Sequence, residues 1–147
     1  MISTSQEWTG TFFKSISLKQ IGLRIQLGHS LDDPCINPKS AHGDAFIVID
    51  VNGIHEVGLD FCECHRMEDH PKQLLRARWF PATVSSPQTA ATFNVLEYFQ
   101  LLTFESKASV FEYLNSLSRR TDNTGIKDRP VSIFYLLYFQ YDTDPDI

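Results

Sequence analysis

The chain has 147 residues, of which 42% are hydrophobic and 12% aromatic, and its formal net charge is −5. This length predicts a single domain, residues 1–147, with a real hydrophobic core, and the composition excludes a disordered chain. The negative charge argues against non-specific binding to nucleic acid, which needs a positive field to displace counterions. The longest apolar run, residues 133–139, is too short to cross a bilayer, and no secretory signal is recognisable at the start.

The first clear element is a strand over residues 19–29, KQIGLRIQLGH. Its apolar side chains alternate with polar residues and glycines, which predicts one buried face and places His29 at the end of the strand. The following residues, 30–44, are rich in Pro, Asp, Asn and Gly and predict a loop. Cys35 lies inside this loop.

Residues 45–50 and 54–62 predict the two strands of a β-hairpin. Between them lies Asn52–Gly53, a pair that favours a type I′ turn because both positions need a positive φ angle. A two-residue turn at Asn52–Gly53 would bring Asp50 opposite His55 and Val48 opposite Val57.

The second half of the chain changes from strand to helical spacing. Residues 73–80, QLLRARWF, predict one more strand, which Pro81 ends. A serine cap followed by Pro87 predicts the start of a helix, and residues 105–120 predict a second one, with Ser106 as a candidate cap. The run over residues 131–141 fits helix or strand equally well.

This order of elements predicts an α+β fold. In it, an antiparallel sheet of three to four strands from the N-terminal half is covered by two to three helices from the C-terminal half.

The three cysteines of the chain are Cys35, Cys62 and Cys64. An odd number forms no disulfide framework, and in a reducing compartment clustered cysteines more often bind a metal than each other. With His29, the three thiolates would complete a closed tetrahedral zinc site, provided that the strand bends or ends at Cys62. Plain burial of the cysteines and an ordinary hydrogen-bonded His29 are the alternative, and His65 and His70 are substitute ligands.

Two other groups of side chains have both a functional and a structural interpretation. Asp50 could orient the imidazole of His55 for acid–base chemistry, but a buried hydrogen bond that holds the hairpin is the favoured interpretation. Arg76 and Arg78, beside Trp79, could contact phosphates and stack on a base, but a solvated strand face is the ordinary interpretation.

Several motifs in order resemble a known family. They are W-x-G-x-FF, SL-x-x-IGLRIQLGH, NGIHEVGLDFCEC, QLLRARWFPAT and P-x-TAATF-x-VLE, and the resemblance spans about residues 7–129. Together they are similar to the second class of CxC-type cysteine cluster, found beside Kyakuja–Dileera–Zisupton (KDZ) transposases in fungi. The metal-type residues of that family fall on His29, Cys35, Cys62 and Cys64. Residues 130–147 diverge from the family pattern.

The resemblance implies a module of a mobile-element protein rather than a stand-alone enzyme. In such proteins the domain follows a small Cys/His finger and precedes a ribonuclease-H-like transposase core. Neither is recognisable in this sequence, which therefore looks like a solitary or truncated copy.

We therefore expect a non-catalytic module that binds zinc and is intracellular, with the nucleus as a candidate compartment. Its expected partner is a protein, such as a transposase, or nucleic acid, with weak or no DNA binding by this chain alone and no membrane association. The alternatives are a metal-dependent hydrolase or nuclease that uses Asp50 and His55, and a decayed transposon fragment without activity.

Overall fold

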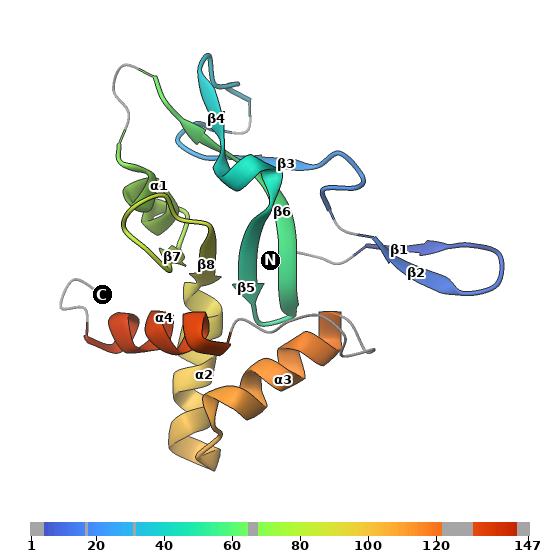
Figure 1. Cartoon of the computed structure of the whole chain (residues 1–147), viewed down its shortest axis with the longest axis vertical. Helices are drawn as coiled ribbons and strands as arrows, with labels where there is room; N and C mark the ends of the chain where they lie inside the picture. The colour runs from blue at the N-terminus through green and yellow to red at the C-terminus, as the bar shows by residue number, and fades with distance from the viewer. Residues whose placement is uncertain (1–4, 17, 31, 65–67, 122–130, 144–147) are drawn as a thin grey trace.

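The computed structural model of the chain is an α+β fold, in which a mixed β-sheet stands above a group of helices (Figure 1). It describes residues 5–16, 18–30, 32–64, 68–121 and 131–143. The helices are α1 (His70–Arg76), α2 (Phe93–Ser106), α3 (Val110–Thr121) and α4 (Val131–Thr143), with a short 3₁₀ helix, η1 (Ala41–Asp44). The expected α+β class is confirmed.

The main sheet is mixed, whereas the sequence predicted an antiparallel one. Its strand order is β3 (Arg24–Gln26), β6 (Gly53–Cys62), β5 (Phe46–Asp50), β8 (Thr89–Thr92) and β7 (Trp79–Pro81), and β4 (Pro38–Ser40) also pairs with β6. The β3–β6 and β5–β8 pairs are parallel, and the others are antiparallel. The sheet therefore has six strands in a mixed arrangement instead of three to four antiparallel ones. The strands β4 and β8 were not predicted, and β3 and β8 each pair with a neighbour in parallel. A separate hairpin is formed by β1 (Ser5–Trp8) and β2 (Phe13–Ile16).

Buried apolar side chains of the described residues form two clusters. One fills the space between the lower end of the sheet and the helices, with Phe99 of α2, Leu114 of α3 and Phe134 of α4 among its members. The other lies higher in the sheet and includes Phe46, Leu59 and Leu74. Helices α2, α3 and α4 therefore pack on the end of the sheet opposite to the loop that carries Cys35, whereas α1 lies nearer to that loop (Figure 1).

The strand predicted over residues 19–29 is much shorter in the structure. Only Arg24–Gln26 forms β3, and the side chains of Ile21 and Leu23 are 49% and 53% exposed. The reason is a turn in which the N–H of Gly22 donates to the carbonyl of Lys19 at 3.0 Å. Gly22 has a φ of +80°, which glycine adopts without steric penalty, so the alternation breaks there.

The strand predicted over residues 73–80 is also wrong. Residues 70–76 form α1, which has Pro71 in its first turn, and only Trp79–Pro81 forms a strand. Arg78 between them has a φ of +61°, which turns the chain from helix into strand. The apolar spacing that resembled one strand belongs to two elements. They are α1, which buries Leu74, and β7, which begins shortly after it and is largely buried.

The helix predicted from Pro87 begins later, at Phe93. The preceding residues 89–92 are all buried, because β8 runs between β5 and β7 in the sheet. Thr92 caps α2, since its hydroxyl accepts the N–H of Val95 at 3.2 Å. Ser109, not Ser106, caps α3 through a reciprocal pair of bonds with Glu112, and the ambiguous C-terminal run is the helix α4.

The hairpin forms as expected, but its turn lies one residue earlier than predicted. Asp50 pairs with Gly53 and Val48 with His55, so Val51 and Asn52 are the central turn residues. The Asp50 carboxylate accepts the N–H of Val51 at 2.9 Å and the hydroxyl of Thr92 at 2.7 Å, which holds Asp50 at the end of β5. The register is shifted by two residues, so every side chain keeps its predicted face.

His55 is buried, and its ring Nε2 lies 2.8 Å from Oδ1 of Asn52. Burial lowers the pKa of His55 below its ordinary 6.5, and the negative charge of Asp50 only partly offsets this. As the pH falls through about 6.5, the unfolded chain takes up a proton before the folded chain does, so His55 contributes a loss of stability at acid pH.

We expect His55→Gln to reduce this loss. The free energy of unfolding, measured with urea at about pH 7.5 and about pH 5.5, should change less in the variant than in the natural chain. His42→Asn, at an exposed position, is the matched control and should keep the natural pH dependence. Equal pH dependence in His55→Gln and the natural chain would contradict the assignment.

Candidate metal centre

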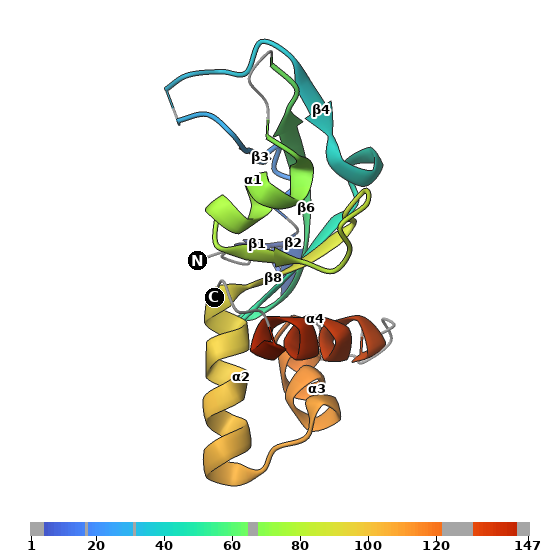
Figure 2. The same cartoon turned by 90° about the vertical axis from the view of Figure 1, so that its left-hand side faces the viewer.

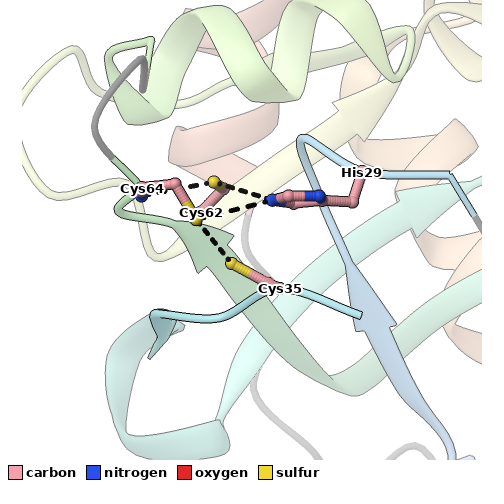
Figure 3. Close-up of side chains that lie close together, drawn as sticks. All are labelled: His29, Cys35, Cys62 and Cys64. Atoms are coloured by element: carbon pink, nitrogen blue, oxygen red, sulfur yellow. Dashed lines mark hydrogen bonds between the residues drawn. The ribbon is translucent and has the colours of Figure 1, made fainter. Parts of the chain in front are cut away.

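The four predicted ligand side chains lie together and point toward one another (Figure 3). They are His29, just after β3, Cys35 in the following loop, Cys62 at the end of β6, and Cys64 two residues later. Their ligand atoms all lie within 4.8 Å of one another. Two pairs of residues that are 27 to 35 positions apart in sequence thus meet at one end of the sheet.

The distances between the ligand atoms fit a single tetrahedral ion. Nε2 of His29 lies 3.2 Å from Sγ of Cys62 and 3.6 Å from Sγ of Cys64, and the Sγ atoms of Cys35 and Cys64 are 3.6 Å apart. Zinc bonds of about 2.0–2.3 Å place neighbouring donors at about 3.6–3.8 Å at the corners of a tetrahedron. A disulfide would need about 2.05 Å, and all three cysteines are free.

Cys62 and Cys64 converge because β6 ends between them. After Cys62 the chain is held by Asn37, whose carbonyl accepts the N–H of Glu63 and whose side-chain amide donates to the carbonyl of Glu63, both at 3.0 Å. The N–H of Cys64 then points back to Sγ of Cys62 at 3.4 Å. The condition set by the sequence, that the strand must end here, is met.

Gly28 lets His29 reach the cysteines. It has a φ of +80°, and a Cβ atom at this position would lie only 2.7 Å from Cβ of Cys62. The preceding residue, Leu27, donates its N–H to the carbonyl of Asp60 at 2.9 Å, so β3 is held against β6 up to this point. A residue without a side chain is therefore required where the two strands approach most closely.

Three further polar side chains position the ligands. Oδ2 of Asp33 lies 2.9 Å from Nδ1 of His29, which orients Nε2 toward the sulfur atoms. Gln73 of α1, which is 4% exposed, accepts the N–H of Cys62 and donates to its carbonyl, both at 2.9 Å. Gln26 accepts the N–H of Cys35 at 2.9 Å and donates to the carbonyl of Asp33 at the same distance.

None of these three supporting residues was identified from the sequence. Asp33, four residues after His29, offered a weak signal in its spacing. Gln26 and Gln73 offered none, because a glutamine that serves a buried backbone amide looks like any other glutamine until the fold is known.

The ligands also perturb one another electrostatically. The pKa of His29 rises to about 9, mainly because of Asp33 and then of Cys64 and Cys62, and the hydrogen bond from His29 lowers the pKa of Cys64 to about 6. Burial raises the pKa of Cys35 to about 11. A divalent cation binds the deprotonated forms of cysteine and histidine, so its binding here would displace the protons that these groups carry.

The other candidate residues do not join this centre. His70 stacks on the ring of Phe61 with 4.1 Å between the ring centroids and lies outside the cluster, and His65 falls outside the described residues.

The predicted basic strand face is wrong. Arg76 lies on α1 and pairs with Glu68 at 2.5 Å, whereas Arg78 lies in a turn, 3.4 Å from Glu97, with its guanidinium over the ring of Phe93. The two arginines therefore lie on different elements, and each guanidinium group forms an ion pair with a carboxylate.

The chain also matches a known family over the segment that carries this centre. Residues 18–125 match the CxC2-like cysteine cluster associated with KDZ transposases. The chain belongs to this family. The match spans all four clustered side chains and confirms the resemblance seen in the sequence motifs. Comparisons with curated proteins and with solved structures find no match.

The family is an accessory cysteine cluster of transposases rather than their catalytic core. Among the described residues, the helices are too short or too polar to pass through a bilayer.

Gly28→Ala should destabilise the metal centre, and Gly22→Ala is its matched control. Both glycines have a φ of +80°, but a Cβ at Gly22 meets nothing within 4 Å. We expect Gly22→Ala to lower the free energy of unfolding by about 1 kcal/mol through backbone strain alone. Gly28→Ala must also displace Cys62 and should lose about 2 kcal/mol more, together with metal. Urea unfolding and elemental analysis measure both effects, and equal losses in the two variants would contradict the proposed close packing.

Proposed function

We propose that this domain is a non-catalytic zinc-binding module, in which His29, Cys35, Cys62 and Cys64 hold one Zn²⁺. The observation that carries the proposal is the donor set itself, three sulfur atoms and one imidazole nitrogen at tetrahedral separations. Thiolates and imidazole together favour zinc over magnesium or calcium, which prefer oxygen ligands. Four protein ligands close the coordination shell, so a zinc ion here would stabilise structure and would have no open position for a substrate.

A structural role agrees with the composition of this end of the domain. Among the described residues of the loop from Gly28 to Asn37, which are 28–30 and 32–37, none contributes a side chain to either hydrophobic cluster, and Ile36 is 93% exposed. A bound ion would join this loop to the end of β6 where apolar packing does not. Thiolate ligands persist in reducing compartments, which supports an intracellular location.

The Asp50 and His55 pair offers little support for a hydrolase. The Asp50 side chain is only 3% exposed and is bonded to Thr92 and to the backbone of Val51, and His55 is buried beside Asn52. We therefore propose that the module acts by binding, as an accessory of a transposase-related protein. A protein partner is favoured over DNA because Arg76 and Arg78 are paired with carboxylates and the chain carries a net charge of −5.

Purified protein should contain one zinc ion per chain, and removal of zinc should unfold the cluster. Structural zinc contributes on the order of 10 kcal/mol to folding in small zinc domains, so treatment with a chelator should lower the thermal midpoint markedly. Elemental analysis of Cys35→Ser and Cys64→Ser should show loss of zinc, whereas His70→Ala should retain it. A metal-free protein with an unchanged thermal midpoint would disprove the site.

DNA binding by the isolated chain should be weak. In a titration of a short labelled duplex at physiological salt, we expect a Kd above about 10 µM, because a negative protein surface opposes counterion release. Tight binding that the double change Arg76→Ala and Arg78→Ala removes, without loss of zinc, would show instead that this is a nucleic-acid module.

A further inference from the structure

The outer face of α2 exposes three large apolar side chains. Tyr98, Leu101 and Phe104 are 50%, 62% and 78% exposed and follow one another at intervals of three residues along the helix. In Figure 2, α2 stands vertically at the lower left of the molecule, with α3 and α4 to its right. Its other face buries Leu96 and Phe99 in the core. The helix is therefore apolar on both faces, whereas a helix whose outer face is exposed to solvent is typically polar on that face.

Helix α3 provides the contrast within the same domain. It buries Leu114 and Leu117, and its exposed positions, apart from Phe111, are polar: Glu112, Ser116, Arg119 and Arg120. The exposed apolar residues of α2 are thus a property of that helix and not of the helical layer as a whole.

Helix α4 lies beside α2 at Gln100, and it also exposes an apolar side chain. The side chain of Gln100, one turn before Phe104, donates to Asp142 of α4 at 3.1 Å. Phe139, which is 60% exposed, lies one turn before Asp142 on α4. We call the outer side chains Tyr98, Leu101 and Phe104 the α2 surface. Exposed apolar groups gathered in this way mark interaction sites in soluble proteins.

Carboxylates border the α2 surface. Glu97 and Glu105 lie one turn before and one turn after Leu101, and both are exposed. Glu97 forms an ion pair with Arg78 at 3.4 Å. Asp142 of α4 provides a further carboxylate beside Gln100. A partner that covers Leu101 therefore meets an exposed carboxylate one turn away on each side of it, and the charge of Glu97 is partly offset by Arg78.

A second copy of the chain fits this pattern poorly. Two α2 helices packed antiparallel about Leu101 would place Glu97 of one copy opposite Glu105 of the other. A parallel pair would place each glutamate opposite itself. Both arrangements bring like charges together at an interface, which opposes association.

We propose that the α2 surface binds an amphipathic helix of a protein partner, with an apolar stripe over Leu101 and Lys or Arg residues facing Glu97 and Glu105. Packed helix pairs use apolar residues at intervals of three and four, which match the spacing along α2. The inference rests on the proposed role as an interaction module, but it does not depend on the bound metal. It places partner binding at the end of the domain opposite to the metal centre (Figure 1).

Two synthetic helical peptides test the proposal with the full chain. Both are about 18 residues long and carry the same leucine stripe at helical spacing, but one has lysines beside the stripe and the other has glutamates. Fluorescence anisotropy of the labelled peptides measures binding. We expect the lysine peptide to bind about tenfold more tightly than the glutamate peptide, because only the former complements the bordering carboxylates.

Three variants locate the binding. Leu101→Ala keeps a good helix former at an exposed position and should weaken the lysine peptide about tenfold. Glu97→Gln with Glu105→Gln should remove most of the preference for lysine. Val84→Ala, at a position that is 85% exposed but outside the α2 surface, should change nothing.

Equal binding of the two peptides, or no binding of the lysine peptide, would overturn the proposal. So would a concentration-dependent dimer in light scattering that Leu101→Ala abolishes, since the occupant would then be a second copy. Zinc content is measured in the same preparations. Full zinc without peptide binding counts against the α2 surface alone, and peptide binding without zinc counts against the metal site alone.

Discussion

The close approach of Gly28 to Cys62 is the constraint on which the upper end of this domain depends. It requires β3 to run parallel to β6, with the N–H of Leu27 bonded to the carbonyl of Asp60, and it requires a glycine at the point of contact. Only with this spacing does the next residue, His29, reach the two cysteines that end β6. The loop that continues from His29 then returns Cys35 to the same point.

The two ends of the sheet are stabilised by different physics. At the lower end, aromatic and aliphatic side chains of α2, α3 and α4 pack on β5 and β8, and the bond between Asp50 and Thr92 ties the hairpin to the start of α2. At the upper end, the loops carry few apolar groups, and polar contacts to backbone amides from Gln26 and Gln73 hold the cluster of potential ligands. A bound metal ion can stabilise the folded state where a loop has too few apolar side chains to form a hydrophobic core.

This division suits an accessory module of a transposase-associated family. In the proposed zinc site, four protein ligands would leave no position for a substrate, and the buried Asp50 and His55 form hydrogen bonds within and beside the hairpin. The most exposed apolar side chains of α2 lie at the other end, bordered by Glu97 and Glu105. Folding at one end and recognition at the other can therefore be changed by mutation independently.

The sequence by itself determined the features that depend on residue chemistry and short-range spacing. The ligand set was predicted because cysteine and histidine are the residues that bind zinc, and the hairpin because Asn52–Gly53 favours a tight turn. The stripes of α2 and α3 were also recognisable, since their period is local to each helix.

Only the tertiary structure decided what depends on non-local contacts. It shortened the strand before His29, where Lys19 and Gly22 form a turn, and it showed that residues 70–76 are a helix. It placed residues 89–92 in the sheet, because pairing with β5 and β7 outweighs local preference. It shifted the hairpin by two residues, because Asp50 bonds to Thr92, which is distant in sequence. It also revealed Gln73 beneath Cys62 and the exposed face of α2, since burial is a property of the packed molecule and periodicity alone does not distinguish a covered face from an open one.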